Sequence, residues 1–322
     1  MTVMAVIKRI GFCLSMAVLA ACQAGAASDL PNAAGATSAA PTTDIAPTLA
    51  RSPDARRLNL RVIQSGHSLT DPIPEILRGM VSARGIQNPV IDRSTIPGSP
   101  MSWRWDNAPG YGEPDARADI GKYEVLVLTE GVSMSLTLPH HKSDELALRW
   151  FKNTWSKGNN GKGAETILYA SWVHITSGPN WENPYKDPEG NIPFRKRLPL
   201  EFARWEHVAK YVNANRPKGS PAMRIIPGPL LMAALYDAIQ AGRAPGLTNI
   251  SDVFEDEIHV NDKGAYFIAL AHYAVIYGQN PRGLPYNLGL ARPPSRDLAL
   301  WMQDLVWKVV TDYKGAGVRA SG

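Results

Sequence analysis

A serine near the amino terminus and a histidine near the carboxyl terminus are of the types needed for nucleophilic acyl chemistry. Ser68 stands in the segment Gly66-His67-Ser68-Leu69, directly after an apolar run, and Asp256 precedes His259 by three residues. A serine hydroxyl becomes a useful nucleophile only when a base takes its proton and an acid orients that base. One short turn would let the Asp256 carboxylate reach the His259 imidazole. Each motif alone is short and common. Whether Ser68 and His259 come together depends on the helices and strands that position them.

The rest of the chain alternates between strand and helix patterns. Short apolar, β-branched runs predict strands at 58–65, 89–91, 123–129, 165–172 and 224–227. Helical periodicity with capping residues predicts helices at 74–84, 143–157, 199–215 and 230–241, one from an Asn261 cap to Tyr277, and one after a Ser295 cap. Strands that alternate with helices of this length predict an α/β fold, a doubly wound parallel sheet flanked by helices.

Three candidate residues follow the ends of predicted strands. Ser68, Gly98 and Glu130 each lie just past such an end or in the loop beyond it. In open parallel sheets, ligands bind outside the carboxyl ends of the strands. The architecture therefore places the Ser68 motif where chemistry is expected.

The Gly66-His67-Ser68-Leu69 and Asp256-Glu257-Ile258-His259 segments, at opposite ends of one α/β domain, resemble the first and last blocks of the SGNH/GDSL hydrolase superfamily. The first block there is Gly-Asp-Ser-Leu and the last is Asp-x-x-His, and the resemblance spans about residues 58–315. It implies a three-layer, flavodoxin-like sandwich. It also implies that Ser68 is the nucleophile, His259 the general base and Asp256 the residue that orients it.

The same resemblance implies an oxyanion hole, a set of donors that stabilises the negatively charged oxygen of the intermediate. Its expected donors are the backbone N–H of Ser68 and that of Gly98, the candidate for the glycine of the second block. The third block departs from the family pattern, because Leu128-Thr129-Glu130-Gly131 stands where Gly-x-Asn-Asp is expected. An ionised Glu130 cannot donate to an oxyanion, so the hole has two donors or recruits another group.

Four further residues are possible substrate-binding groups. Glu130 is placed to position a sugar hydroxyl. Trp103 and Trp105 follow Gly98 in a predicted long loop, where indole rings suit stacking on sugars and equally suit anchoring of the loop against the rest of the domain. His67 replaces the aspartate of the family's first block, and a loop hydrogen bond is its simpler role.

Metal and cofactor sites are not predicted. The adjacent His140 and His141, in a predicted proline-led loop, have no carboxylate at metal-site spacing, and His272 within an apolar helix reads as a core residue.

The first 56 residues differ in composition from the domain. Lys8 and Arg9 precede an apolar run that is shorter than the ~20 residues of a membrane-spanning helix, so residues 1–21 read as a signal peptide. Leu19-Ala20-Ala21-Cys22 resembles a lipobox, which implies lipidation of Cys22 and the periplasmic side of a bacterial outer membrane. Ordinary cleavage near Ala24-Gly25-Ala26, leaving a periplasmic or secreted protein, is the alternative. Residues 22–56 read as a flexible tether rich in Ala, Ser, Thr and Pro, and 57–322 as the domain.

The cysteine content and the charge argue against a disulfide-stabilised domain and against nucleic-acid binding. Cys13 and Cys22 are the only cysteines, so a chain processed at position 22 has no disulfide in its domain. The formal net charge is +5, and loss of Lys8 and Arg9 lowers it by two. The basic residues form no stripe with aromatic residues, so nucleic acid is not an expected partner.

These features predict a cell-envelope serine esterase. The expected substrate is a small acyl ester, an acetyl group on a carbohydrate above all, because no long apolar lid or acyl channel is visible in the sequence. Two alternatives stay open: the same triad can transfer an acetyl group to a sugar, or the chain is a non-catalytic glycan-binding lipoprotein with a degenerate hydrolase fold.

Overall fold

A parallel β-sheet organises the domain. The structure is a computed structural model, and it describes residues 53–110 and 112–320. In these residues the sheet has the strand order β2-β1-β3-β4-β5 and all neighbours run parallel. The strands are β1 (Val62–Gly66), β2 (Ile91–Thr95), β3 (Val125–Leu128), β4 (Glu165–Ala170) and β5 (Arg224–Pro227). Four of the five predicted strands lie where the sequence placed them, and β2 shares only Ile91 with the predicted 89–91 run.

The central strands are buried on both faces, as their nearly continuous apolar sequences require. On β3, Val125 and Val127 face one hydrophobic core, and Leu126 and Leu128 face the other. Successive side chains of a strand point to opposite faces, so a continuous apolar run serves two cores at once.

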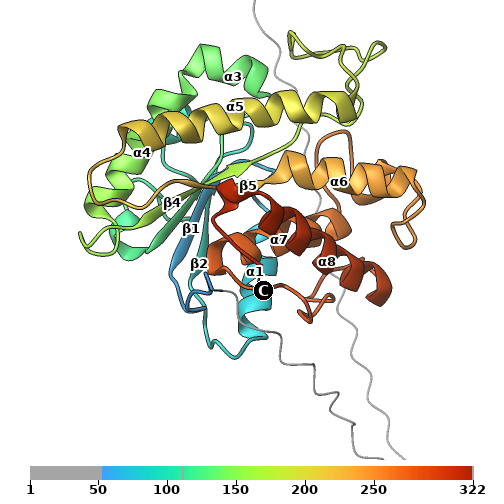
Figure 1. Cartoon of the computed structure of the whole chain (residues 1–322). Coiled ribbons are helices and arrows are strands. Elements are labelled where there is room, and N and C mark those ends of the chain that lie inside the picture. The colour runs from blue at the N-terminus through green and yellow to red at the C-terminus, as the bar shows by residue number, and fades with distance from the viewer. Residues whose placement is uncertain (1–52, 111, 321–322) are drawn as a thin grey trace, which may run out of the picture. The chain divides into compact units, whose positions relative to one another are not determined.

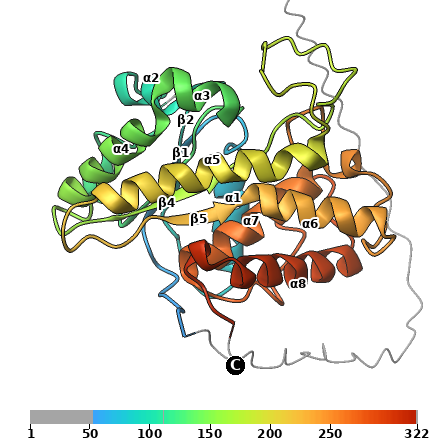
Figure 2. The ribbon, with the colours of Figure 1, turned by 45° about the horizontal axis from the view of Figure 1, so that its top comes forward.

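Helices cover both faces of the sheet, and Figure 1 shows the two layers on either side of the strands. The first core lies under α1 (Ile73–Ser82), α6 (Gly228–Gln240), α7 (Asp262–Tyr277) and α8 (Arg296–Asp312). The second lies under α2 (Met101–Asp106), α3 (Met134–His141), α4 (Ser143–Lys157) and α5 (Phe194–Asn215), and Figure 2 shows α5 running across this face. Short 3₁₀ helices are η1 (Ile120–Lys122), η2 (Ile250–Val253) and η3 (Lys314–Ala316). The predicted three-layer α/β fold is confirmed.

Helix α7 is the most deeply buried helix of the domain. Its side chains are buried from Gly264 to Tyr277, as expected for a helix that is apolar on all sides. Asn261 caps its amino end by accepting hydrogen bonds from the N–H groups of Lys263 and Gly264. The Asn261 cap and the Ser295 cap of α8 lie where the sequence predicted them.

Four elements differ from the sequence-based expectation. Strand β2 begins at Ile91, near the end of the predicted 89–91 run. Helices α2 and α3 occupy segments that were predicted to be loops, so His140 and His141 end a helix rather than lie in a loop. Both helices are short, and Pro139 lies inside α3, so neither shows enough turns of periodicity to be recognised from sequence. Helix α5 begins at Phe194, five residues before the predicted start at Pro199.

The signal peptide, Cys22 and most of the predicted tether lie outside the described residues. Arg56 is described and contacts the domain, because its N–H donates to the Tyr277 carbonyl at 2.8 Å and its guanidinium pairs with Glu165. No helix within the described ranges has the length and hydropathy needed to cross a membrane.

Candidate active site

Ser68, His259 and Asp256 form a continuous hydrogen-bonded relay. The Ser68 Oγ atom lies 2.9 Å from His259 Nε2, and His259 Nδ1 lies 2.7 Å from Asp256 Oδ2. With the imidazole proton on Nδ1, the ring donates to the carboxylate and its Nε2 lone pair accepts the serine hydroxyl proton. The structure thus brings together the three residues that the two terminal motifs singled out.

A tight turn holds Asp256 and His259 in register. Phe254 and Val260 form an antiparallel β-bridge, and the Glu255 N–H donates to the His259 carbonyl at 2.8 Å. Asp256 Oδ1 accepts the N–H groups of Ile258 at 2.8 Å and His259 at 2.7 Å. Burial alone would raise the pKa of Asp256, but these N–H donors and the His259 ring together hold it below its ordinary value. The carboxylate therefore stays ionised and keeps the imidazole oriented.

Glycine at the end of β1 permits the sharp bend that presents Ser68. A Cβ added to Gly66 would lie 2.0 Å from Thr70 Oγ1, because the loop folds back over the strand end. The Thr70 N–H donates to the His67 carbonyl at 2.7 Å and closes this turn. A larger residue at position 66 would therefore require Thr70 or the chain around it to shift.

The two predicted oxyanion donors lie in neighbouring loops. Gly98 follows β2 with φ +66°, a conformation that favours glycine, and Ile96 N–H donates to the Gly66 carbonyl at 3.1 Å. Within the described residues, the N–H groups of Ser68 and Gly98 donate to no protein acceptor. Both are therefore free to donate to a bound oxygen.

Glu130 and His67 are buried and bind protein backbone. This corrects the predicted sugar contact of Glu130, whereas His67 takes the loop hydrogen bond that was its simpler expected role. Glu130 is 0% exposed, and its Oε1 accepts the N–H groups of Met101 and Gly131, each at 2.7 Å. His67 Nε2 lies 2.9 Å from the Glu130 carbonyl oxygen. Burial, with the nearby charge of Arg104, lowers the pKa of His67 to about 4, so its ring is neutral. These side chains join the loops that follow β1, β2 and β3.

Arg104 connects the loops that surround Ser68, a role that the sequence did not indicate. Its buried guanidinium donates to the carbonyls of Ser99 and Thr129 and, through Nε, to Ser65 Oγ at 3.2 Å. Burial lowers its pKa to about 10, although the charge of Glu130 opposes this shift. Nothing in the sequence around Arg104 indicates that it is buried, because it is enclosed only where the loops after β2 and β3 come together.

The two predicted tryptophans have different environments. Trp105 packs edge-on against Trp150 at 5.1 Å between ring centroids, and the Arg149 guanidinium lies 4.2 Å from its ring centroid. Trp105 is therefore engaged in packing, which favours the second of its two expected roles, anchoring of the loop. Trp103 is 55% exposed and lines a pocket of about 470 Å³ beside the Ser68 loop, together with Asp71, Thr95 and Asn107.

A second pocket, of about 510 Å³, adjoins the Trp103 pocket. The two share Asp71, Arg93 and Glu113, so polar side chains continue along the outer edge of β2. Glu113 pairs with Arg93 and accepts the Thr95 N–H at 3.0 Å, which covers part of this strand edge.

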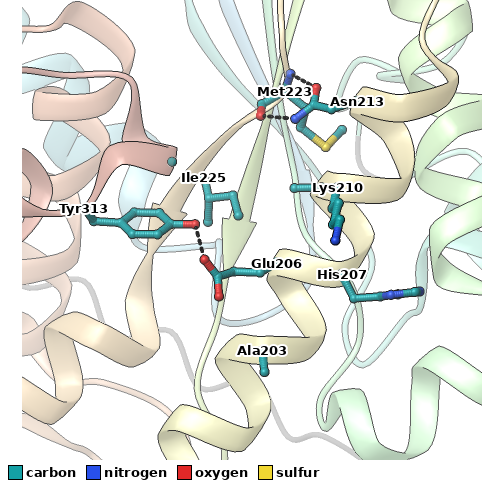
Figure 3. Close-up of a pocket in the computed structure, with 10 residues that line it drawn as sticks. Ala203, Glu206, His207, Lys210, Asn213, Met223, Ile225 and Tyr313 are labelled. Carbon is teal, nitrogen blue, oxygen red and sulfur yellow. Dashed lines mark hydrogen bonds between the residues drawn. The ribbon is translucent and has the colours of Figure 1, made fainter.

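A larger pocket, of about 620 Å³, lies near the amino end of β5 (Figure 3). Glu206 accepts the Tyr313 hydroxyl at 3.1 Å there, and the Asn213 amide binds both backbone groups of Met223. The Ser68 relay lies at the carboxyl ends of the strands, so this pocket lies at the opposite end of the strands from the relay. In the ranges that the structure covers, no group of three His, Cys, Asp or Glu side chains is placed to hold a metal ion.

Comparison with known proteins identifies a solved structure of similar fold. No family model matches the chain, and no curated protein matches it. A DUF4886 family protein from Bacteroides uniformis is similar in structure, with 15% identity, a TM-score of 0.55, and coverage of 78% of this chain and 94% of that one. An acetyl xylan esterase, AlAXEase, aligns with 15% identity and a TM-score of 0.43 over 67% of this chain and 100% of that one. At this identity, the similarity to the Bacteroides protein establishes that the two chains share an α/β fold.

Proposed function

We propose that this protein is a serine esterase that removes small acyl groups, acetyl above all, from carbohydrate. The observation that carries the proposal is the relay from Ser68 Oγ through His259 to Asp256, with donor–acceptor distances of 2.9 and 2.7 Å. Hydrogen bonds of these lengths join a nucleophile to its base and the base to its orienting acid.

The proposed reaction follows from these contacts. His259 Nε2 takes the hydroxyl proton as Ser68 Oγ attacks the ester carbonyl, and the resulting oxyanion accepts the N–H groups of Ser68 and Gly98. The protonated His259 then gives its proton to the leaving alcohol as the carbon–oxygen bond breaks. In the second step His259 takes a proton from water as the water oxygen attacks the acyl-Ser68 ester. His259 then returns that proton to Ser68 Oγ as the acyl–Oγ bond breaks and the carboxylic acid leaves. Asp256 stabilises the imidazolium in both steps.

The surroundings of Ser68 favour a polar alcohol over a lipid. The neighbouring pockets are lined by Asp71, Arg93, Asn107 and Glu113, and Trp103 offers an exposed indole face. A long acyl chain would need an apolar channel, whereas a sugar needs hydrogen-bonding groups beside a flat ring. The two adjoining pockets share Asp71, Arg93 and Glu113 and continue along the outer edge of β2, which favours an oligomeric or polymeric alcohol.

The proposed location is the bacterial cell envelope, on the periplasmic side of the outer membrane, with Cys22 lipidated. Its support is the sequence of the first 22 residues. A periplasmic or secreted form is the alternative if cleavage occurs near Ala24-Gly25-Ala26. Radiolabelled fatty acid incorporation by the full chain, and its loss in Cys22→Ala, would separate the two.

The test of the activity is hydrolysis of acetate, butyrate and octanoate esters of p-nitrophenol by residues 53–322. We expect the acetate to be the best substrate and Ser68→Ala to lower its kcat by at least about a thousandfold. Ser82→Ala is the matched control, because Ser82 is exposed at the end of α1. Equal slow hydrolysis by the parent and Ser68→Ala would reject the esterase. An assay with added free sugar distinguishes transfer, since a transferase would form acetylated sugar in place of acetate.

A further inference from the structure

Three aromatic rings form a cluster in the long loop between β4 and α5. His174 stacks on Tyr185, with 5.0 Å between ring centroids and 22° between planes, and it lies 4.9 Å from Trp181. Tyr185 is 58% exposed, while His174 beneath it is 7% exposed. One face of the Tyr185 ring therefore covers the histidine, and a large part of the side chain remains open to solvent.

Direct contacts connect this cluster to the turn that holds Asp256 and His259. Glu257, which lies between those two residues, accepts the Trp181 indole N–H at 3.2 Å through Oε2. The Ile175 N–H donates to the Glu257 carbonyl at 2.8 Å, and Trp172 Nε1 donates to the Ile258 carbonyl at 2.9 Å. The cluster thus lies beside the proposed active site, on the β4 side, whereas Trp103 lies on the β2 side.

A buried charge network holds the loop in place. Arg197, on α5, pairs with Asp187 of the loop and with Glu201 at 3.0 Å. Ser133 and Ser135, which follow β3, each donate to Asp187 at 2.7 Å. These groups are almost completely shielded from solvent. The aromatic cluster is therefore fixed before any ligand arrives, which lowers the entropy cost of binding.

His174 leaves hydrogen-bonding capacity unused. Among the described residues, neither ring nitrogen of His174 has a hydrogen-bond partner, and Nδ1 is buried without one. Burial lowers the pKa of His174, although the carboxylates of Glu257, Asp187 and Asp256 act against this shift. A neutral imidazole offers one donor and one acceptor. A polar group of this kind beside an exposed aromatic ring suits a ligand that has both flat apolar faces and hydroxyl groups.

We propose that His174, Trp181 and Tyr185 form a sugar subsite that binds a pyranose ring of the acylated carbohydrate next to the ester. The ring packs on the aromatic side chains, above all Tyr185, and the neighbouring polar groups bind its hydroxyls. The proposal rests on the esterase function and adds a second binding region, opposite Trp103. A glycan chain bound at both would cross the Ser68 nucleophile.

The charge around this subsite selects among carbohydrates. Glu182, Glu255, Asp256 and Glu257 carry negative charge on the loop and the turn, and Lys186 is the nearby exposed base of the loop. An excess of carboxylates repels uronic acids. Neutral glycans are therefore the expected ligands of the His174–Trp181–Tyr185 subsite.

Hydrolysis of two acetate esters tests the subsite: ethyl acetate, which has no ring, and an acetylated neutral hexose oligosaccharide. We expect Tyr185→Ala to lower kcat/KM for the oligosaccharide by about tenfold and to leave ethyl acetate within about twofold. Tyr185→Phe should keep most of the activity because it keeps the ring. Asn191→Ala, an exposed change on the same loop, is the matched control. Oligosaccharide kinetics that are the same in Tyr185→Ala and Asn191→Ala would overturn the proposal.

A binding measurement separates failure of the subsite from failure of the esterase. Ser68→Ala protein is titrated with the same oligosaccharide by calorimetry, with and without Tyr185→Ala. Weaker binding in the double variant supports the subsite even if the parent hydrolyses neither ester, which would reject the esterase alone. Equal binding with and without Tyr185, or tighter binding of an acetylated polyuronate than of the neutral oligosaccharide, would overturn the subsite as described.

Discussion

His259 Nε2 lies 2.9 Å from Ser68 Oγ, although 191 positions separate the two residues in the sequence. The contact is possible because β1 is a central strand and the turn after η2 reaches its carboxyl end. Loss of either side chain removes the relay without removing a core residue, since both are partly exposed. The relay can therefore be tested by substitutions that preserve the fold.

Substitution of the orienting acid should affect turnover more than binding. In Asp256→Asn the carboxylate no longer accepts from His259 Nδ1, which favours the wrong tautomer of the ring. We expect kcat on p-nitrophenyl acetate to fall by roughly 10³–10⁴-fold with little change in KM. Glu255→Gln, an exposed neighbour, should retain parent activity. A loss of less than tenfold in Asp256→Asn would show that the carboxylate does not orient the base.

Removal of the exposed indole on the β2 side should weaken polymer binding. Trp103→Ala is expected to raise KM for acetylated polysaccharide several-fold, because a stacking contact with an aromatic ring contributes about 1 kcal/mol to binding. Hydrolysis of ethyl acetate should stay at the parent rate. Val90→Ala, at another exposed apolar residue, is the control. Equal losses on both substrates would indicate a structural role for Trp103.

The buried network around Arg197 should contribute strongly to stability. Arg197→Met leaves the carboxylates of Asp187 and Glu201 buried without their cation, so we expect a loss of about 3–5 kcal/mol in the free energy of unfolding. Arg195→Met removes an exposed ion pair with Asp237 from the same helix and should cost about 0–1 kcal/mol. Urea unfolding of both variants measures the difference. Similar losses in the two would mean that the buried pairs add nothing beyond a surface pair.

Buried neutral histidines should make the domain sensitive to acid. Burial lowers the pKa of His272 to about 4, so below the ordinary value of about 6.5 the unfolded chain binds a proton that the folded chain does not. The contribution of neutral His272 to the free energy of unfolding is complete above pH 6.5. It is lost as the pH falls towards 4, and the loss is about 2 kcal/mol at pH 5.

Comparison of His272→Leu with the parent in urea at pH 7 and pH 5 measures this contribution. The variant should lose less stability on acidification, while His140→Leu, at an exposed histidine, should behave like the parent. An unchanged acid sensitivity in His272→Leu would assign the effect to other groups, of which His67 is the first to examine, because its pKa is also lowered to about 4.

The sequence by itself predicted the strands, the later helices with their Asn261 and Ser295 caps, and the residues Ser68, Asp256 and His259. These depend on local patterns, which are periodicity, capping and short motifs. It did not predict α2 or α3, which are too short to show a period, or the burial of Arg104 and Glu130 and the packing of Trp105 against Trp150. Whether a charged or aromatic side chain in a loop contacts solvent or protein depends on which loops meet at the carboxyl edge of the sheet. The tertiary structure alone decided that Glu130 binds backbone N–H groups, that Trp103 stays exposed, and that His174, Trp181 and Tyr185 gather beside the relay.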